Sequence, residues 1–185
     1  ITCMDYKKYF FHYSDSISEL LKKVDTNLIN DSVNLIANTK KNKNKIYIVG
    51  NGGSSSIASH VSVDFTKTAK INCSTFNNAN LITCFANDYK YENWVVEAIK
   101  AYSLKQDLFI LISSSGTSKN IVNAAQYCKQ KKINLITLSG FKKNNPLSQS
   151  GNINFYVESE EYNFIEMTHH IILLSIVDIF AKKIY

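Results

Sequence analysis

The stretch IYIVGNGGSSSIASHVSVDF, residues 46–65, decides the fold of this chain. It predicts a short buried strand, a glycine-rich turn over residues 50–53 and a helix that opens on three serines. Glycines let the backbone approach a ligand closely, while free N–H groups and the positive end of the helix dipole attract anions. The glycine spacing matches neither the phosphate loop of nucleotide triphosphatases nor the dinucleotide fingerprint. We therefore expect an anion site here, with a phosphate group as its ligand and no nucleotide cofactor.

A second serine-rich turn, SSSGTS at residues 113–118, follows another predicted strand and precedes another predicted helix. Its hydroxyl and N–H groups could donate to phosphate oxygens, with Gly116 providing the tight turn. Serines also cap helices routinely, so this turn alone leaves both interpretations open. Two such turns in one sheet favour a phosphate cradle.

Two predicted helices each carry a histidine and a carboxylate on one face. His60 and Asp64 lie four residues apart, and Glu166 precedes His169 and His170 by three and four residues. Ordinary surface ion pairs would explain this spacing equally well. If the helices meet, however, four side chains could bind Zn²⁺ or another divalent metal, or serve as acid and base: His60, Asp64, Glu166 and His170.

The order of elements along the chain predicts an α/β fold. Helical spacing of apolar residues extends to about residue 41, as two helices joined near residues 25–27. Strands are expected over residues 46–49, 70–75, 108–112, 134–138 and 153–157, with helices between them and a long last helix over residues 160–184. Strands that alternate with helices indicate a parallel sheet covered on both faces, and ligands bind such sheets at the carboxyl ends of the strands. Both serine-rich turns lie at such ends.

Composition is that of a soluble globular domain, with 45% hydrophobic and 19% charged residues in a chain of 185. The formal net charge is +6 and every basic residue is Lys, so that phosphate recognition would use N–H groups, hydroxyls and Lys in place of a guanidinium clamp. No recognition-helix motif or interleaved basic and aromatic stripe is present, and we expect no direct binding of nucleic acid.

The expected localisation is cytoplasmic, without a membrane partner. The apolar run IILLSIVDIF, residues 171–180, is too short and too mixed to span a bilayer. The four cysteines lack CxxC spacing and fall largely within apolar segments, which predicts reduced core thiols. They are Cys3, Cys73, Cys84 and Cys128.

Four ordered motifs resemble the sugar isomerase (SIS) domain family, specifically its phosphoheptose isomerase branch. They are GNGGSSS with His60 and Asp64, FANDYKYE at residues 85–92, ISSSGTSKN at residues 112–120, and a final helix with Glu166 and His169. The resemblance covers nearly the whole chain and implies a single SIS domain over residues 1–185, a three-layer parallel α/β sandwich. It further implies a homotetramer with active sites between subunits, and the helices of residues 1–41 used in oligomer packing.

The resemblance also assigns site residues by position. Asn51 and Asp88 would contact sugar hydroxyls, and His60 matches a metal ligand of the family. Glu166 stands where the family has a metal-binding Gln, so that it would contact substrate or metal. The remaining substrate contacts would come from the two turns: Gly52, Gly53, Ser54, Ser113, Ser114, Ser115 and Ser118.

The catalytic residues depart from the family pattern. Asp64 occupies the place of the catalytic Glu and is one methylene shorter, while the second catalytic His falls on Leu174. His170 lies one turn before Leu174 on roughly the same face, and we expect it to substitute. Asp64 and His170 are therefore the predicted catalytic pair, with zinc expected on His60, Asp64, Glu166 and His170.

The function implied is conversion of sedoheptulose 7-phosphate to the aldose phosphate through an enediol, for surface polysaccharide synthesis. The loss at Leu174 leaves an alternative open, namely a non-catalytic SIS module that binds a phosphosugar or docks on a protein, as a replication-initiator-associating relative does. A pentose phosphate isomerase of the same superfamily is a third hypothesis.

Overall fold

The computed structural model describes residues 5–182 and has a five-stranded parallel sheet at its centre. The strands are β1 (Ile46–Gly50), β2 (Cys73–Ser74), β3 (Leu108–Ser113), β4 (Asn134–Ser139) and β5 (Ile153–Tyr156). Their order is β2-β1-β3-β4-β5, and every neighbouring pair is parallel. The predicted parallel sheet is confirmed, although the strand expected over residues 70–75 is only two residues long.

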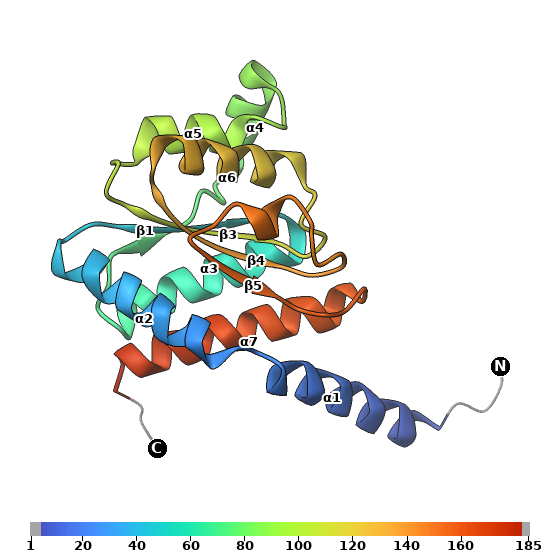
Figure 1. The fold of residues 1–185 in the computed structure, drawn as a ribbon. Coiled ribbons are helices and arrows are strands. Elements are labelled where there is room, and N and C mark those ends of the chain that lie inside the picture. The colour runs from blue at the N-terminus through green and yellow to red at the C-terminus, as the bar shows by residue number, and fades with distance from the viewer. Residues whose placement is uncertain (1–4, 183–185) are drawn as a thin grey trace.

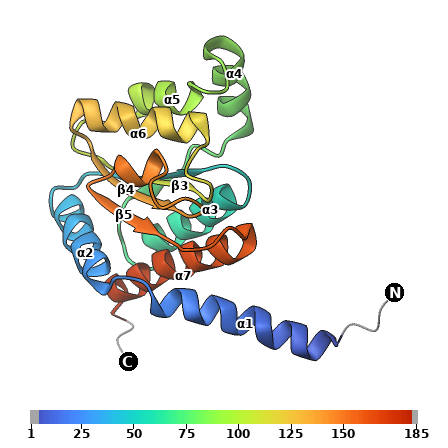
Figure 2. The same ribbon diagram turned by 45° about the vertical axis from the view of Figure 1, so that its right-hand side comes forward.

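Helices cover both faces of the sheet, which confirms the three-layer sandwich. In both ribbon views α2, α3 and α7 lie on one face and α5 and α6 on the other, with α4 beside α5 (Figures 1 and 2). The helices are α1 (Tyr6–Lys22), α2 (Thr26–Lys41), α3 (Gly52–Lys67), α4 (Ala79–Tyr89), α5 (Trp94–Tyr102), α6 (Lys119–Lys131), the short 3₁₀ helix η1 (Leu147–Gln149) and α7 (Tyr162–Phe180).

Alternation along the strands divides the core into two clusters. Successive side chains of a strand point to opposite faces, so Ile46 and Ile48 pack toward α3 and α7, while Tyr47 and Val49 pack toward α5 and α6. Every residue of β1 and β3 is buried. The strands that precede the two serine-rich turns are therefore held rigidly on both sides.

Strand order places the ligand crevice. β1 continues into α3 on one face, whereas its neighbour β3 continues into α6 on the other face. The chain thus leaves adjacent strands in opposite directions, and in parallel sheets a crevice opens at the carboxyl ends of the strands where this happens. Here it lies between Gly50 and Ser113.

The two N-terminal helices are joined as expected, with Asp25 as the N-cap of α2. Its carboxylate accepts a hydrogen bond from the backbone N–H of Asn27 at 2.9 Å. Helix α1 has no buried residue and projects from the body of the domain (Figures 1 and 2). It meets α7 through the edge-to-face rings of Tyr13 and Phe164, whose centroids are 4.8 Å apart.

Helix α7 is a core helix that begins at Tyr162 and ends at Phe180, short of the predicted 160–184. Residue 184 lies outside the described residues. Within residues 5–182, α7 is the one helix long and apolar enough to cross a membrane, with a mean hydropathy of 1.3. In this fold it packs against α3 and α2. Its buried residues are Ile165, Thr168, His169, Ile172, Leu173, Ile176 and Val177.

The described cysteines are free thiols, but only two of them lie in the core. Burial raises the pKa of the Cys73 thiol strongly and that of Cys128 to about 12, so both stay protonated. Cys84 is exposed on α4, and its predicted place in the core is wrong because no residue of that helix is buried. Cys3 lies outside the described residues.

Candidate active site

The crevice at the ends of β1 and β3 holds a cavity of about 230 Å³. Larger cavities of about 490 and 600 Å³ lie elsewhere on the domain, and neither contains a residue of the serine-rich turns. The structure therefore brings the two turns together, as the sequence predicts. The lining residues are Asn51, Gly52, Gly53, Ser54, Ile112, Ser113, Ser114, Ser115, Ser118, Tyr162 and Glu166.

Two helix N-termini face this cavity without a side-chain cap. Asn51 and Ser118 hold the N-cap positions of α3 and α6, yet neither side chain bonds to its own helix. The Ser118 hydroxyl instead accepts a hydrogen bond from the Ser113 hydroxyl at 3.1 Å. Within residues 5–182, the backbone N–H groups of residues 52–54 and 119–120 have no acceptor. Such free N–H groups at the positive end of a helix bind anions.

Buried hydroxyls complete the cradle. Ser114 is 5% exposed, and its Oγ has no hydrogen-bond partner among the described residues. Ser54 is buried as well, while the hydroxyl of Ser115 shares a hydrogen bond of 3.0 Å with that of Thr117. A buried hydroxyl without a partner is unfavourable. A phosphate oxygen in the cavity would supply the missing acceptor.

A pair of side-chain amides ties the two turns together. Nδ2 of Asn51 donates to Oδ1 of Asn120, and Nδ2 of Asn120 donates to Oδ1 of Asn51, both at 2.9 Å. The Tyr91 hydroxyl adds a longer bond of 3.4 Å to the same Asn51 oxygen. Neither Asn120 nor Tyr91, nor Tyr162 in the cavity wall, could be predicted as a site residue, because contacts across the crevice leave no spacing signal along the chain.

The histidines of α3 and α7 meet, which the spacing along the sequence leaves open. His170 Nε2 lies 2.9 Å from His60 Nδ1, and His60 Nε2 lies 3.4 Å from Asp64 Oδ2. Asp64, His60 and His170 thus form one chain of contacts, which we call the His–Asp–His cluster. Partial burial, together with the neighbouring His60, lowers the pKa of His170, against an opposing effect of Asp64. A histidine with a lowered pKa is neutral at pH 7 and can accept a proton.

The structure decides which of the two adjacent histidines faces the cluster. His169 is fully buried on a different face of α7, where Nε2 lies 3.2 Å from the Ser139 carbonyl oxygen. Burial lowers the pKa of His169 to about 4. His170 is therefore the histidine available to a ligand, and His169 is part of the core.

Glu166 lies against Gly53 at the start of α3. A Cβ at position 53 would collide with the Glu166 carboxylate, so the close approach depends on glycine. The contacts of Glu166 with Gly53 and of His170 with His60 place α3 and α7 side by side in the same direction. Glu166 thus lines the cavity, one helical turn before His170.

The four predicted zinc ligands do not converge in this arrangement. Both ring nitrogens of His60 already face protein atoms, and Glu166 points into the cavity at Gly53. No three His, Cys, Asp or Glu side chains of residues 5–182 form a group that could hold a metal ion. A metal at His60 and His170 would need to replace the hydrogen bond that now joins their ring nitrogens.

Two further residues of the sequence analysis lie away from the cavity. Asp88 is exposed near the end of α4 and accepts a bond of 2.9 Å from the Asn87 amide. In this segment it is Tyr91, three residues later, that reaches the crevice. Leu174 is half-buried and packs against the core cluster.

Comparisons with known proteins agree with this geometry. Residues 10–140 match the SIS domain family. Phosphoheptose isomerase 2 of Campylobacter jejuni is 40% identical over 144 residues, which cover 70% of this chain and 69% of that protein. A phosphoheptose isomerase of Helicobacter pylori is 32% identical over 189 aligned residues, 96% of each chain. The structure of a phosphoheptose isomerase from Francisella tularensis superposes with a TM-score of 0.86 at 21% identity, covering 98% of this chain and all of that one.

Proposed function

The chain belongs to the SIS domain family, in its phosphoheptose isomerase branch, and from that membership we propose that it interconverts sedoheptulose 7-phosphate and the corresponding aldose phosphate. The observation that carries this proposal is the cavity between the uncapped N-termini of α3 and α6. The His–Asp–His cluster lies farther along α3 and on the neighbouring α7. A phosphate bound in the cavity would anchor one end of the sugar. The other end of the sugar would extend toward the ionisable side chains of the His–Asp–His cluster.

The distance between the two parts of the site fits a long sugar. Gly53 at the cavity and His60 in the cluster are seven residues apart on α3, which is a rise of about 10 Å. An extended seven-carbon chain spans a comparable distance between its terminal phosphate and the C1–C2 pair at the other end. This match supports a heptose phosphate over a shorter substrate.

The reaction moves one proton between two carbon atoms. A base removes a proton from C1 of the ketose, and an acid protonates the oxygen on C2, which gives the enediol. Return of a proton to C2 and loss of the proton on the C1 oxygen give the aldehyde. We assign these transfers to Asp64 and His170, which flank His60 at 3.4 and 2.9 Å.

His60 links the two groups. A neutral imidazole carries one proton. When Nε2 of His60 donates a hydrogen bond to Asp64, its Nδ1 accepts a hydrogen bond from the Nε2–H of His170, and Nδ1 of His170 keeps a free lone pair. The contacts therefore support a role for His170 as the residue that exchanges protons with the sugar oxygens, because its lowered pKa keeps it neutral.

Turnover of a panel of sugar phosphates tests the proposal. Sedoheptulose 7-phosphate should give an aldose phosphate, and five-carbon ketose phosphates should react much more slowly because they cannot span the site. Turnover of the five-carbon sugar alone would indicate a pentose phosphate isomerase. Binding of all the sugars without turnover would favour the non-catalytic module.

Zinc remains a prediction that rests on the resemblance to the family. The proton transfers assigned above involve side chains of this chain alone. Elemental analysis of protein purified without chelator should show about one zinc per chain if His60 and His170 exchange their hydrogen bond for a shared metal. A metal-free and fully active protein would remove the prediction.

We further propose a homotetramer of cytoplasmic location that supplies surface polysaccharide synthesis. Exposed aromatic side chains on α1 support association between copies, because apolar surface of this kind is usually covered by a partner. Light scattering coupled to gel filtration would give the mass of the assembly. The exposed aromatic residues of α1 are Tyr6, Tyr9, Phe10 and Phe11.

A further inference from the structure

We infer that Asn120 is a positioning residue of the phosphate cradle: it holds the Asn51 side chain away from the end of α3 and so keeps the first backbone N–H groups of that helix open to a ligand. The inference rests on the proposed function in one respect, namely that the ligand carries a phosphate. It does not depend on the isomerase chemistry.

The starting observation is that the side chain of Asn51 does not cap helix α3. Asn51 is the N-cap residue of α3, with the extended backbone of that position at φ −112° and ψ 153°, yet its side chain makes no bond to the helix. Asn at this position normally accepts a hydrogen bond from the second or third N–H. Asn78 does so at the start of α4, where its Oδ1 accepts from the backbone of Asn80 and Leu81 at 2.9 and 3.2 Å.

Asn120 accounts for the difference between these two asparagines. It is 2% exposed in the first turn of α6 and engages both ends of the Asn51 amide, at 2.9 Å each. Two hydrogen bonds to the buried amide of Asn120 outweigh the single bond that a cap would give. The Asn51 oxygen therefore points across the crevice and is not available to its own helix.

The consequence is a free anion site. With Asn51 held aside, the N–H groups of Gly52, Gly53 and Ser54 have no acceptor within residues 5–182, while Ser55 N–H bonds to the Asn51 carbonyl at 3.3 Å. If Asn120 were absent, the released amide oxygen could turn back and accept from Gly53 or Ser54. It would then occupy the position that a phosphate oxygen needs.

Asn120→Ala tests the inference, with inorganic phosphate as the probe. We expect its affinity for phosphate, measured by calorimetry, to fall about tenfold, because one capping bond of ordinary strength would compete with the ligand. Amide hydrogen exchange at Gly53 and Ser54 should become slower in the free variant as the cap forms. A general loss of structure would make that exchange faster.

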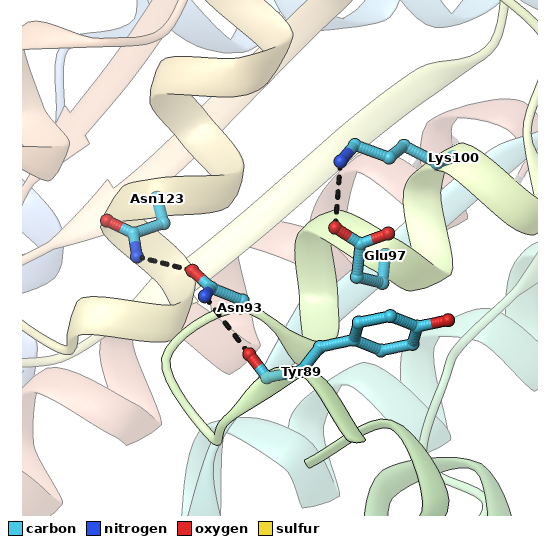
Figure 3. A network of polar contacts seen from close by, with 5 residues as sticks. All are labelled: Tyr89, Asn93, Glu97, Lys100 and Asn123. Atoms are coloured by element: carbon cyan, nitrogen blue, oxygen red, sulfur yellow. Dashed lines mark hydrogen bonds and ion pairs between the residues drawn. The ribbon is translucent and has the colours of Figure 1, made fainter. Parts of the chain in front are cut away.

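A matched control lies one turn further along α6. The Asn123 amide donates to the Glu92 carbonyl oxygen at 2.9 Å. It also donates to Asn93 Oδ1 at 3.3 Å, and Asn93 in turn donates to the Tyr89 carbonyl oxygen (Figure 3). Asn123→Ala also removes a partly buried amide from α6, but it leaves the Asn51 pair intact. Its phosphate affinity should stay at the wild-type value.

A double-mutant cycle separates positioning from direct binding. In an Asn51→Ala background there is no amide left to hold, so Asn120→Ala should cause no further loss of phosphate affinity. An equal loss in both backgrounds, or wild-type affinity and exchange in Asn120→Ala alone, would overturn the inference. If Asn120→Ala does not fold, Asn120→Ser carries the same expectations.

Normal phosphate binding without sugar turnover would refute the proposed function and leave this inference standing.

Discussion

The ring nitrogens of His170 and His60 lie 2.9 Å apart, with the rings nearly perpendicular, across the contact between α7 and α3. The contact joins two histidines separated by 110 positions in the sequence. It also brings Asp64 and His170 to opposite sides of one imidazole. The acid–base roles proposed here depend on this contact.

His170→Gln should lower turnover of the heptose phosphate by about 10²- to 10⁴-fold, the usual contribution of one acid–base group. The amide can still bond to His60, so the fold and phosphate affinity should be retained. His12→Gln on the exposed face of α1 is the control and should leave turnover unchanged. Wild-type turnover in His170→Gln would show that His170 does not replace the family's catalytic His, which is Leu174 in this chain.

Ser114→Ala should raise the stability of the ligand-free protein and lower its affinity for phosphate. Removing a buried hydroxyl that has no partner relieves a desolvation cost, so the free energy of unfolding should rise by about 1 kcal/mol in the absence of ligand. Ser32→Ala is the matched control, because its Oγ on α2 is also buried without a partner. Both variants should melt higher, but only Ser114→Ala should bind phosphate less well. Equal phosphate affinity in the two variants would show that the Ser114 hydroxyl does not contribute to phosphate binding.

Glu166→Gln should bind inorganic phosphate more tightly than the wild type. The Glu166 carboxylate lies in the cavity beside Gly53, where it repels an anion. At the dielectric constant of water, repulsion between unit charges about 4 Å apart is worth about 1 kcal/mol, which is roughly a fivefold change in affinity. Calorimetric titration measures this directly, and the gain should shrink at high salt. Weaker binding would mean that Glu166 organises the cradle.

His169 should make the protein sensitive to acid. Its pKa is about 4 in the folded state and about 6.5 when unfolded, so below pH 6.5 the unfolded state binds more protons. Its stabilising contribution is therefore complete above pH 6.5 and is lost as the pH falls toward 4, by about 3 kcal/mol in total. Denaturant titrations of His169→Asn should show lower stability at pH 7 and a shallower decline between pH 6.5 and 4. An equally steep decline would assign the acid sensitivity to the carboxylates.

The periodicity of the sequence predicts most of this fold because strands and helices alternate with clear turns between them. The helix joint near Asp25 and both serine-rich turns could be located from side-chain chemistry alone. The extent of β2 could not, because an edge strand of two residues has little pattern. Hydrophobicity predicts Cys84 in the core, but it does not reveal that α4 lies at the surface.

The site divides in the same way. Residues within one turn or one helix face, such as His60 with Asp64, follow from spacing. The choice of His170 over His169 requires the rotation of α7 against the core. The pairing of Asn51 with Asn120 depends on the strand order that makes β1 and β3 neighbours, and no local pattern in the chain contains that information.

Turnover of sedoheptulose 7-phosphate in D₂O, with wild type and Asp64→Asn side by side, tests the central claim most directly. The wild type should form the aldose phosphate with deuterium at C2, because the enediol takes up a proton from a group in exchange with solvent. Asp64→Asn should lose the product and still show a higher melting temperature with the sugar phosphate. Undiminished turnover in Asp64→Asn would contradict Asp64 as the base. No product from the wild type, with binding intact, would show that the chain binds the sugar phosphate without isomerising it.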